Sequence, residues 1–101
     1  TVNKVWEVGD ATEYKTDVTV VLSENGQTEE KQIPVADGKV VFKDKLQYTA
    51  AGKKIEYTVT EKRDFANHEL FEAADVKGNA ASGFTVKNIL DFNKVNQKKK
   101  N

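Results

Sequence analysis

The chain of 101 residues has no cysteine and no methionine, and only one proline, one tryptophan and one histidine. Without cysteine, disulfides, thiolate chemistry and cysteine-ligated zinc sites are excluded. No apolar run approaches the roughly 20 residues that a membrane-spanning helix needs. A small domain without such cross-links must find its stability elsewhere. Because the chain opens on Thr1 with no signal-like apolar segment, we expect an internal piece of a larger protein.

An excess of charge of either sign is also missing. Sixteen Lys and Arg residues balance sixteen Asp and Glu residues, so the formal net charge is zero. Electrostatic binding of nucleic acid would need a basic excess or a basic face, and neither is present. The like-charge run within residues 97–101 is typical of a solvated tail. We therefore expect no nucleic-acid partner and no membrane contact by this domain.

Familiar catalytic and metal-binding motifs are absent as well. His68 lies in a polar stretch and is typical of a surface residue rather than a ligand or a base. Asp10, Glu13 and Asp17 do not have the spacing of a calcium loop, and solvated loop acids are the simpler interpretation. No Gly-rich phosphate loop and no Ser/His/Asp motif is present. The sequence thus predicts no turnover of an external substrate, no cofactor and no metal.

What the sequence does contain is strong alternation of apolar and polar residues with a period of two. This alternation predicts strands near residues 2–8, 18–22, 28–35, 39–44, 55–61 and 84–90. Turn signals separate them, including "ENG" at 24–26, and Pro34 places the third strand at an edge or ends it. Residues 64–83 are less regular: they hold a turn of helix, or a long loop or strand that the Leu70-Phe71 pair anchors.

This pattern predicts an all-β fold, an antiparallel-rich sandwich of two sheets. The expected domain covers residues 1–91. Residues 92–101 are expected to form a polar, Lys-rich tail or linker.

Three polar residues occupy positions that the alternation assigns to apolar side chains. Lys4 lies between Val2 and Trp6, Glu61 continues the apolar face of the fifth strand, and Asn88 continues that of the last. Burying an unpaired ion costs several kcal/mol, and an unpaired amide costs roughly 1–3 kcal/mol. Two ordinary explanations compete: strand ends whose polar heads reach water, or a buried Lys4–Glu61 salt bridge with Asn88 beside it.

A third explanation is covalent. A lysine amine can attack the side-chain carbonyl of asparagine, expel ammonia and leave an amide between the side chains. An apolar core lowers the pKa of Lys4 and raises that of Glu61, so a neutral amine meets a neutral acid. Glu61 would then polarise the Asn88 carbonyl and move protons from the attacking nitrogen to the leaving one. Fixed strands supply proximity, worth roughly 7–11 kcal/mol in well-oriented reactions.

The motifs around these residues are similar to one known family. "NKVW" at 3–6, "GKKIEYTVTE" at 52–61 and "FTVKN" at 84–88 resemble the B-type repeat domain of collagen adhesins, the CnaB family, in order and spacing. The resemblance implies a sandwich of transthyretin-like or reversed immunoglobulin-like topology. It also implies an isopeptide bond between Lys4 and Asn88, with Glu61 as the catalytic residue. The chain departs from the family at Lys87, at Leu46-Gln47 and at Thr16-Asp17, away from the three reacting groups.

The resemblance implies a setting on the surface of Gram-positive bacteria, cell-wall anchored, in an adhesin or a pilin. Two functions follow from it. The first is a covalently locked stalk or spacer whose partners are the flanking domains of the same protein. The second is an adhesive module that binds a host extracellular matrix or surface protein through an exposed face or the 64–83 segment. Four aromatic residues in or near connections are the candidates for such a face, although several of them are expected instead to cover the edges of the core: Tyr14, Tyr48, Phe65 and Phe71.

Overall fold

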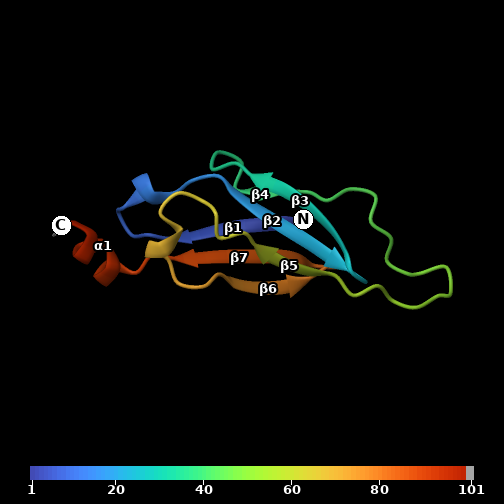
Figure 1. Cartoon of the computed structure of the whole chain (residues 1–101). Helices are drawn as coiled ribbons and strands as arrows, with labels where there is room; N and C mark the ends of the chain where they lie inside the picture. Colours follow the sequence, from blue (N-terminus) through green and yellow to red (C-terminus); the bar gives the residue numbers. More distant parts are fainter. Residues whose placement is uncertain (100–101) are drawn as a thin grey trace.

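Two β-sheets packed against each other form the framework of the computed structural model, which describes residues 1–99 (Figure 1). The four-stranded sheet contains, in spatial order, β4 (Lys39–Val40), β1 (Val2–Glu7), β7 (Gly83–Ile89) and β6 (Asp75–Asn79). The three-stranded sheet contains β3 (Gln27–Ile33), β2 (Val18–Glu24) and β5 (Thr58–Glu61). The remaining elements are two 3-10 turns, η1 (Thr12–Tyr14) and η2 (His68–Leu70), and the helix α1 (Phe92–Lys99). The predicted all-β, two-sheet sandwich is confirmed.

The core lies between the inner faces of the two sheets. Alternate residues of β2 (Val18, Val20 and Leu22) are buried, and so are Phe84 and Val86 of β7. Strands with a period of two present these residues to one face, and burial of each stabilises the fold by about 1.5–3 kcal/mol. The alternation of the sequence therefore predicted the inward faces of these strands correctly.

The first and last strands are neighbours and run parallel, whereas all other strand pairs are antiparallel. In this parallel pair Lys4 is opposite Val86 and Trp6 is opposite Asn88. A parallel pair needs a long crossover connection, and here nearly the whole domain forms that connection. Consequently, residues from opposite ends of the sequence share one inner face.

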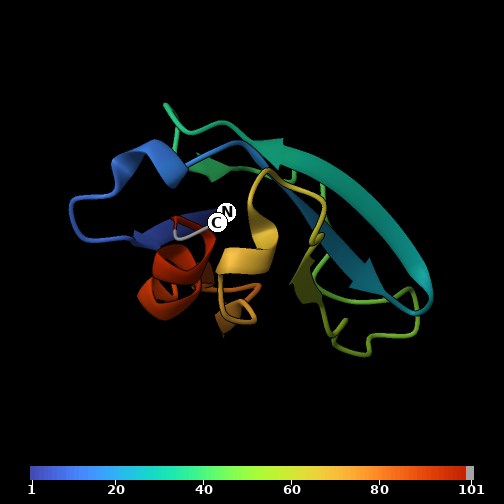
Figure 2. The ribbon, with the colours of Figure 1, turned by 60° about the vertical axis from the view of Figure 1, so that its left-hand side comes forward.

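The β2–β3 hairpin is the longest pairing and curves across the sandwich (Figure 2). Asn25 and Gly26 form its turn with positive φ angles of 45° and 80°, as a type I′ turn requires. β3 ends at Ile33 and is an edge strand, so Pro34 marks both the edge and the end that it predicted.

Two predicted strands are shorter than expected. β4 covers only residues 39–40 of the predicted 39–44, and β5 covers 58–61 of the predicted 55–61. The segment 41–57 leaves the sandwich and pairs with itself, through a bridge between Tyr48 and Lys54 and a bond from the Ile55 amide to the Gln47 carbonyl. It projects beyond the sheets at the right of Figure 1. These local pairs replace the sheet contacts that the alternation had suggested.

β6 lies within the irregular 64–83 segment, where a strand was one of the alternatives but its position was not predicted. It pairs only with β7 and its residues are half-buried or exposed, so no apolar alternation signals it. The preceding segment contains the short helical turn η2, and both Leu70 and Phe71 are buried as anchors, with Phe71 bridged to Leu90.

The stretch expected to be a polar tail contains the helix α1. Asp91 caps it by accepting a bond from the Asn93 amide at 3.0 Å, and Val95 is buried. Lys98 donates to the Asn67 side chain at 2.8 Å, which ties the helix to the segment before η2. A helix of eight residues is marginal by itself, so this docking explains why sequence periodicity missed it. The end of the lysine run, at residues 100–101, lies outside the described residues.

We expect Gly78→Ala to destabilise the fold more than Gly26→Ala. Both glycines have positive φ, but a Cβ at Gly78 would meet the Gly83 carbonyl oxygen at 2.1 Å, whereas one at Gly26 meets nothing within 4 Å. Gly26→Ala should cost about 1 kcal/mol through backbone strain. Gly78→Ala should cost about 3 kcal/mol because the β6–β7 pair must also separate. Denaturant unfolding of the two variants measures this difference, and equal losses would contradict the argument.

Candidate functional site

The fold brings Lys4, Glu61 and Asn88 together between the sheets. Since Lys4 is opposite Val86 in the parallel pair, Asn88 lies two residues further along on the same face, or about 6.6 Å. A lysine side chain spans such a diagonal. Glu61 comes from the other sheet, where it lies opposite the fully buried Val20 of β2.

Direct contacts connect the group. The Asn88 Nδ2 donates to Glu61 Oε1 at 2.8 Å, which joins β7 to β5 across the sandwich. The Lys4 Nζ donates to the Val5 carbonyl at 3.1 Å and lies 3.5 Å from the centre of the Trp6 ring. Trp6 is the strand partner of Asn88, so the amine rests on a ring beside the amide. A cation on a ring face is held by electrostatic attraction.

Burial shifts the ionisation of both titratable groups. Lys4 is 9% exposed and Asn88 is fully buried. Desolvation lowers the pKa of Lys4 from 10.5 to about 8, against the attraction of the Glu61 carboxylate. Desolvation raises the pKa of Glu61, against the hydrogen bond from Asn88 and the positive charges of Lys4 and Arg63. Each shift favours the neutral form of its group.

Neither ordinary explanation fits all three residues. Glu61 ends β5 and is half-buried, but Lys4 and Asn88 are buried and do not hold their polar heads in water. A Lys4–Glu61 salt bridge would bring nitrogen and oxygen within 4.0 Å, and the ion pairs among residues 1–99 do not include this pair. The three groups are thus enclosed together without a conventional ion pair.

Two buried oxygens of the site have no hydrogen-bond partner, Glu61 Oε2 and Asn88 Oδ1. The sequence predicts that Glu61 contacts the Asn88 carbonyl, whereas the observed bond joins Glu61 to the amide nitrogen. Each unpaired buried acceptor costs roughly 1–3 kcal/mol. The site therefore holds polar groups that its present hydrogen bonds do not satisfy.

An aromatic wall closes the site, and sequence reasoning missed it. Trp6 packs edge to face with Phe71 at 5.4 Å and with Phe65 at 6.3 Å between ring centres. Phe65 and Phe71 are buried, so neither is available for the adhesive surface considered above. Tyr14 is half-buried and Tyr48 is 56% exposed. The Leu70-Phe71 pair predicted an inward anchor at Phe71, but the irregular 64–83 segment gave no signal that Phe65 and Phe71 pack against Trp6.

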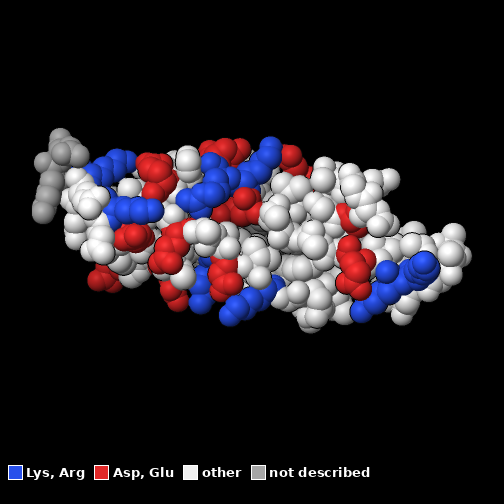
Figure 3. Space-filling model, turned by 60° about the horizontal axis from the view of Figure 1, so that its bottom comes forward, with Lys and Arg blue, Asp and Glu red and all other residues white. Residues whose placement is uncertain are grey.

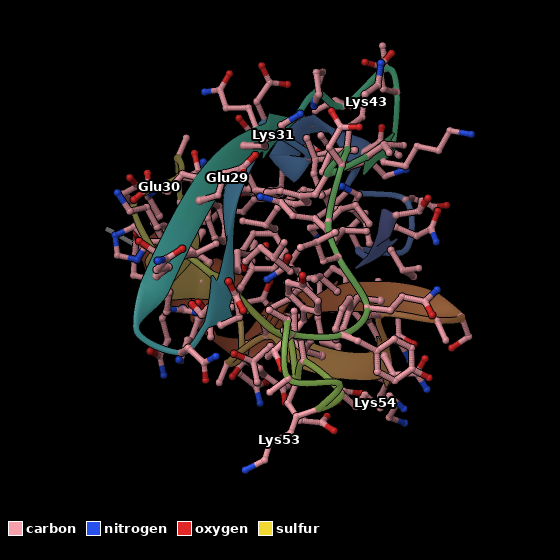
Figure 4. All side chains as sticks on the ribbon, turned by 90° about the vertical axis from the view of Figure 1, so that its right-hand side faces the viewer. Glu29, Glu30, Lys31, Lys43, Lys53 and Lys54 are labelled. Atoms are coloured by element: carbon pink, nitrogen blue, oxygen red, sulfur yellow. The ribbon has the colours of Figure 1, made fainter. Side chains whose placement is uncertain are left out.

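A separate hollow of about 470 Å³ lies at the other end of the sandwich, under the 41–57 segment. Apolar and aromatic side chains line much of it, and Leu46 at its rim is 70% exposed. Figure 4 views this end, where Lys43 and Lys53 extend outward from the segment. None of the three site residues borders this hollow.

The acidic and histidine side chains considered as possible ligands or bases lie at the surface. Asp17 accepts a bond from the Val35 amide at 2.9 Å, and His68 lies 4.0 Å from Glu69. Within residues 1–99, no three His, Cys, Asp or Glu side chains are grouped to hold a metal ion. Acidic and basic residues intermix over the face in Figure 3, in keeping with the balanced charge. No helix in the described part of the chain has the length and apolarity to cross a bilayer.

The lowered pKa of Lys4 predicts a pH-dependent stability. In Asn88→Ala, where Lys4 keeps its amine, the unfolding free energy should rise by about 2–3 kcal/mol between pH 8 and 10.5. In that window the unfolded lysine holds its proton and the folded one has released it, so raising the pH favours the folded state. The measurement is denaturant unfolding against pH. Asn88→Ala with Lys4→Met is the control, and identical pH profiles for the two would refute the prediction.

Comparison with known proteins identifies the domain. The family described as "Cna protein B-type domain" matches residues 1–89, which include all three site residues. Comparisons with curated proteins and with solved structures find no match. The chain therefore belongs to the Cna protein B-type domain family, whose members are structural domains of cell-surface proteins.

Proposed function

We propose that this domain is a stalk or spacer of an adhesin or pilin on a Gram-positive cell wall, locked by a self-formed isopeptide bond between Lys4 and Asn88. The observation that carries the proposal is that Lys4 and Asn88 are buried on neighbouring strands and that the half-buried Glu61 contacts Asn88 from the opposite sheet, with the ionisation of the amine and the acid shifted toward neutrality. In this proposal the domain is not an enzyme with turnover, since the reaction consumes its own side chains.

The chemistry is an aminolysis of the asparagine amide. The neutral Lys4 Nζ attacks Asn88 Cγ, and a new C–N bond forms while Oδ1 takes up negative charge. The bond between Cγ and Nδ2 then breaks, and ammonia leaves. Glu61 transfers one proton from Nζ to Nδ2, so the acid is regenerated and atoms balance. The bond from Nδ2 to Glu61 Oε1 supports this role, because it holds the carboxyl group beside the nitrogen that would leave.

The unpaired oxygens support this role for Glu61. A proton on Oε2 would give Asn88 Oδ1 a donor, and the acid and the amide would pair through two hydrogen bonds instead of one. Such a donor aimed at Oδ1 stabilises the charge that develops during attack. The raised pKa of Glu61 favours the protonated state that this pairing needs.

The bond would stabilise the domain by closing a loop that contains residues 5–87. If it acts like a disulfide of that loop length, the entropy model gives about 4–5 kcal/mol. This is much of the total stability of a small domain. A chain without cysteine thereby acquires a covalent cross-link.

The position of the bond suits a load-bearing spacer. The domain is elongated, with extents of 58 × 24 × 18 Å. The bond would join the parallel terminal strands β1 and β7, so tension entering at the first would pass directly to the second. The adhesive alternative, binding of a host matrix protein, is weaker because Phe65 and Phe71 of the proposed surface are buried.

An intact mass measurement tests the bond. The purified chain should weigh less than its sequence by one ammonia, and Glu61→Ala should restore the full mass because proton transfer is lost. Glu56→Ala is the matched control, since this glutamate is exposed and should leave the loss unchanged. Proteolysis should yield one linked product containing residues 4 and 88. A wild-type chain at full mass after prolonged incubation would refute the proposal.

Pulling single molecules from end to end tests the mechanical role. The intact domain should resist full extension at ordinary unfolding forces, because residues 5–87 lie behind the bond. Asn88→Ala should lengthen by roughly 290 Å more, the contour of those residues. The same extension in both proteins would rule out a load-bearing bond.

A further inference from the structure

The side chain of Arg63 closes the loop that follows Glu61. Its Nη1 donates to the Glu72 carbonyl at 3.1 Å, and its Nη2 donates to the carbonyls of His68 at 2.5 Å and Phe71 at 2.9 Å. One arginine thus ties the start of the 62–74 loop to its end. The planar guanidinium has five donors in a fixed fork, which a lysine cannot reproduce.

The same loop is attached to the strand that carries Asn88. The Glu72 amide donates to the Ile89 carbonyl at 2.9 Å, and the Asp91 amide donates to the Leu70 carbonyl at 2.9 Å. The loop therefore spans from β5, which holds Glu61, to the end of β7. Its position is set at both ends next to the reacting groups.

The inner side of the loop supports the Lys4 amine through aromatic contacts. Phe65 and Phe71 lie 5.7 Å apart between ring centres, and both pack against Trp6. The Trp6 ring in turn holds the Lys4 Nζ at 3.5 Å. A continuous set of contacts leads from the guanidinium to the nucleophile.

We propose that Arg63 is a positioning residue for bond formation: it holds the 62–74 loop closed, so that Phe65 and Phe71 fix Trp6 under the Lys4 amine and exclude water. The inference rests on the proposed isopeptide reaction. Arg63 touches no reacting atom.

The charge of Arg63 would act in the opposite direction. Its positive charge lowers the pKa of Glu61 and so disfavours the acid that the reaction needs. If charge were its only influence, removing it would speed the reaction. If holding the 62–74 loop closed matters more, replacing Arg63 slows bond formation, and the direction of the rate change distinguishes these two effects.

The experiment follows bond formation from an unlinked chain. The full-length polypeptide is made by chemical synthesis, refolded by dilution from denaturant, and sampled over time by mass spectrometry for loss of ammonia. Fluorescence of Trp6, the single tryptophan, reports the folded fraction, and rates are expressed per folded molecule. Poor folding of a variant therefore does not mimic a slow reaction.

Arg63→Gln and Arg63→Lys should both react about tenfold or more slowly than the wild type, since small misplacements of reacting groups have large effects. Lys62→Gln is the matched control: it removes a neighbouring positive charge whose partner is Glu30 on the surface, at 3.0 Å. It should keep the wild-type rate. A faster or unchanged Arg63→Gln, or a wild-type rate in Arg63→Lys, would overturn the inference.

The pH profile separates positioning from general destabilisation. The reactive state pairs a neutral Lys4 amine with a protonated Glu61 carboxyl, so the two groups together hold one proton. Above the pKa of Lys4, about 8, the pair loses this last proton, and the rate of bond formation should fall. The charged group that acts on the Lys4 amine is Glu61, and the charged groups that act on the Glu61 carboxyl are Lys4 and Arg63. An open loop would hydrate Lys4, raise its pKa toward 10.5 and move this limb to higher pH in both Arg63 variants.

If the Arg63 variants react more slowly but their rates fall at the same pH as the wild-type rate, the loop does not exclude water from Lys4 and the inference is overturned. The two proposals also fail separately. If the wild-type chain forms no bond, the proposed function is refuted. If the wild-type chain forms the bond and the Arg63 variants form it at the same rate, only the role of Arg63 is refuted.

Discussion

Desolvation of the Lys4 amine is the constraint on which the site depends. In water this amine is an ammonium ion with no nucleophilic lone pair, and the amide of Asn88 is inert toward it. Between the sheets burial brings the pKa of Lys4 down to about 8 and raises that of Glu61. The cost of this burial is met by the packing of the whole sandwich. The proposed reactivity of the site is therefore a property of the folded core rather than of any local motif.

Through the topology, the proposed bond would connect the two ends of the domain. Because β1 and β7 are parallel neighbours, residues near opposite ends of the sequence share one inner face. Glu61 reaches the same point from the opposing sheet and contacts Asn88 at 2.8 Å. A bond made there would connect the two strands through which, in the proposed role, tension passes. The proposed bond would also explain how the domain gains stability without cysteine.

Much of the fold was predictable because its strands alternate strictly. The inner faces of β1, β2 and β7 followed from their apolar positions, and "ENG" located a turn that Asn25 and Gly26 form with positive φ. Elements whose stability comes from docking were not predictable. β6 is a polar edge strand held by β7, and α1 is a short helix held by one buried valine. The predicted strands were too long at 41–44 and 55–57, because the 41–57 segment pairs with itself outside the sheets, as in the bridge between Tyr48 and Lys54.

The sequence by itself determined which three polar residues would interrupt apolar faces, since alternation assigns each side chain to a face regardless of context. Only the tertiary structure decided that these faces meet, that Glu61 bonds the amide nitrogen of Asn88, and that Lys4 rests on Trp6. It also decided that Arg63 clamps a loop whose two phenylalanines support that ring. The physical reason is separation along the sequence. Alternation relates neighbouring residues of one strand, whereas these contacts join segments from distant parts of the chain. Their partners exist only once both sheets have packed.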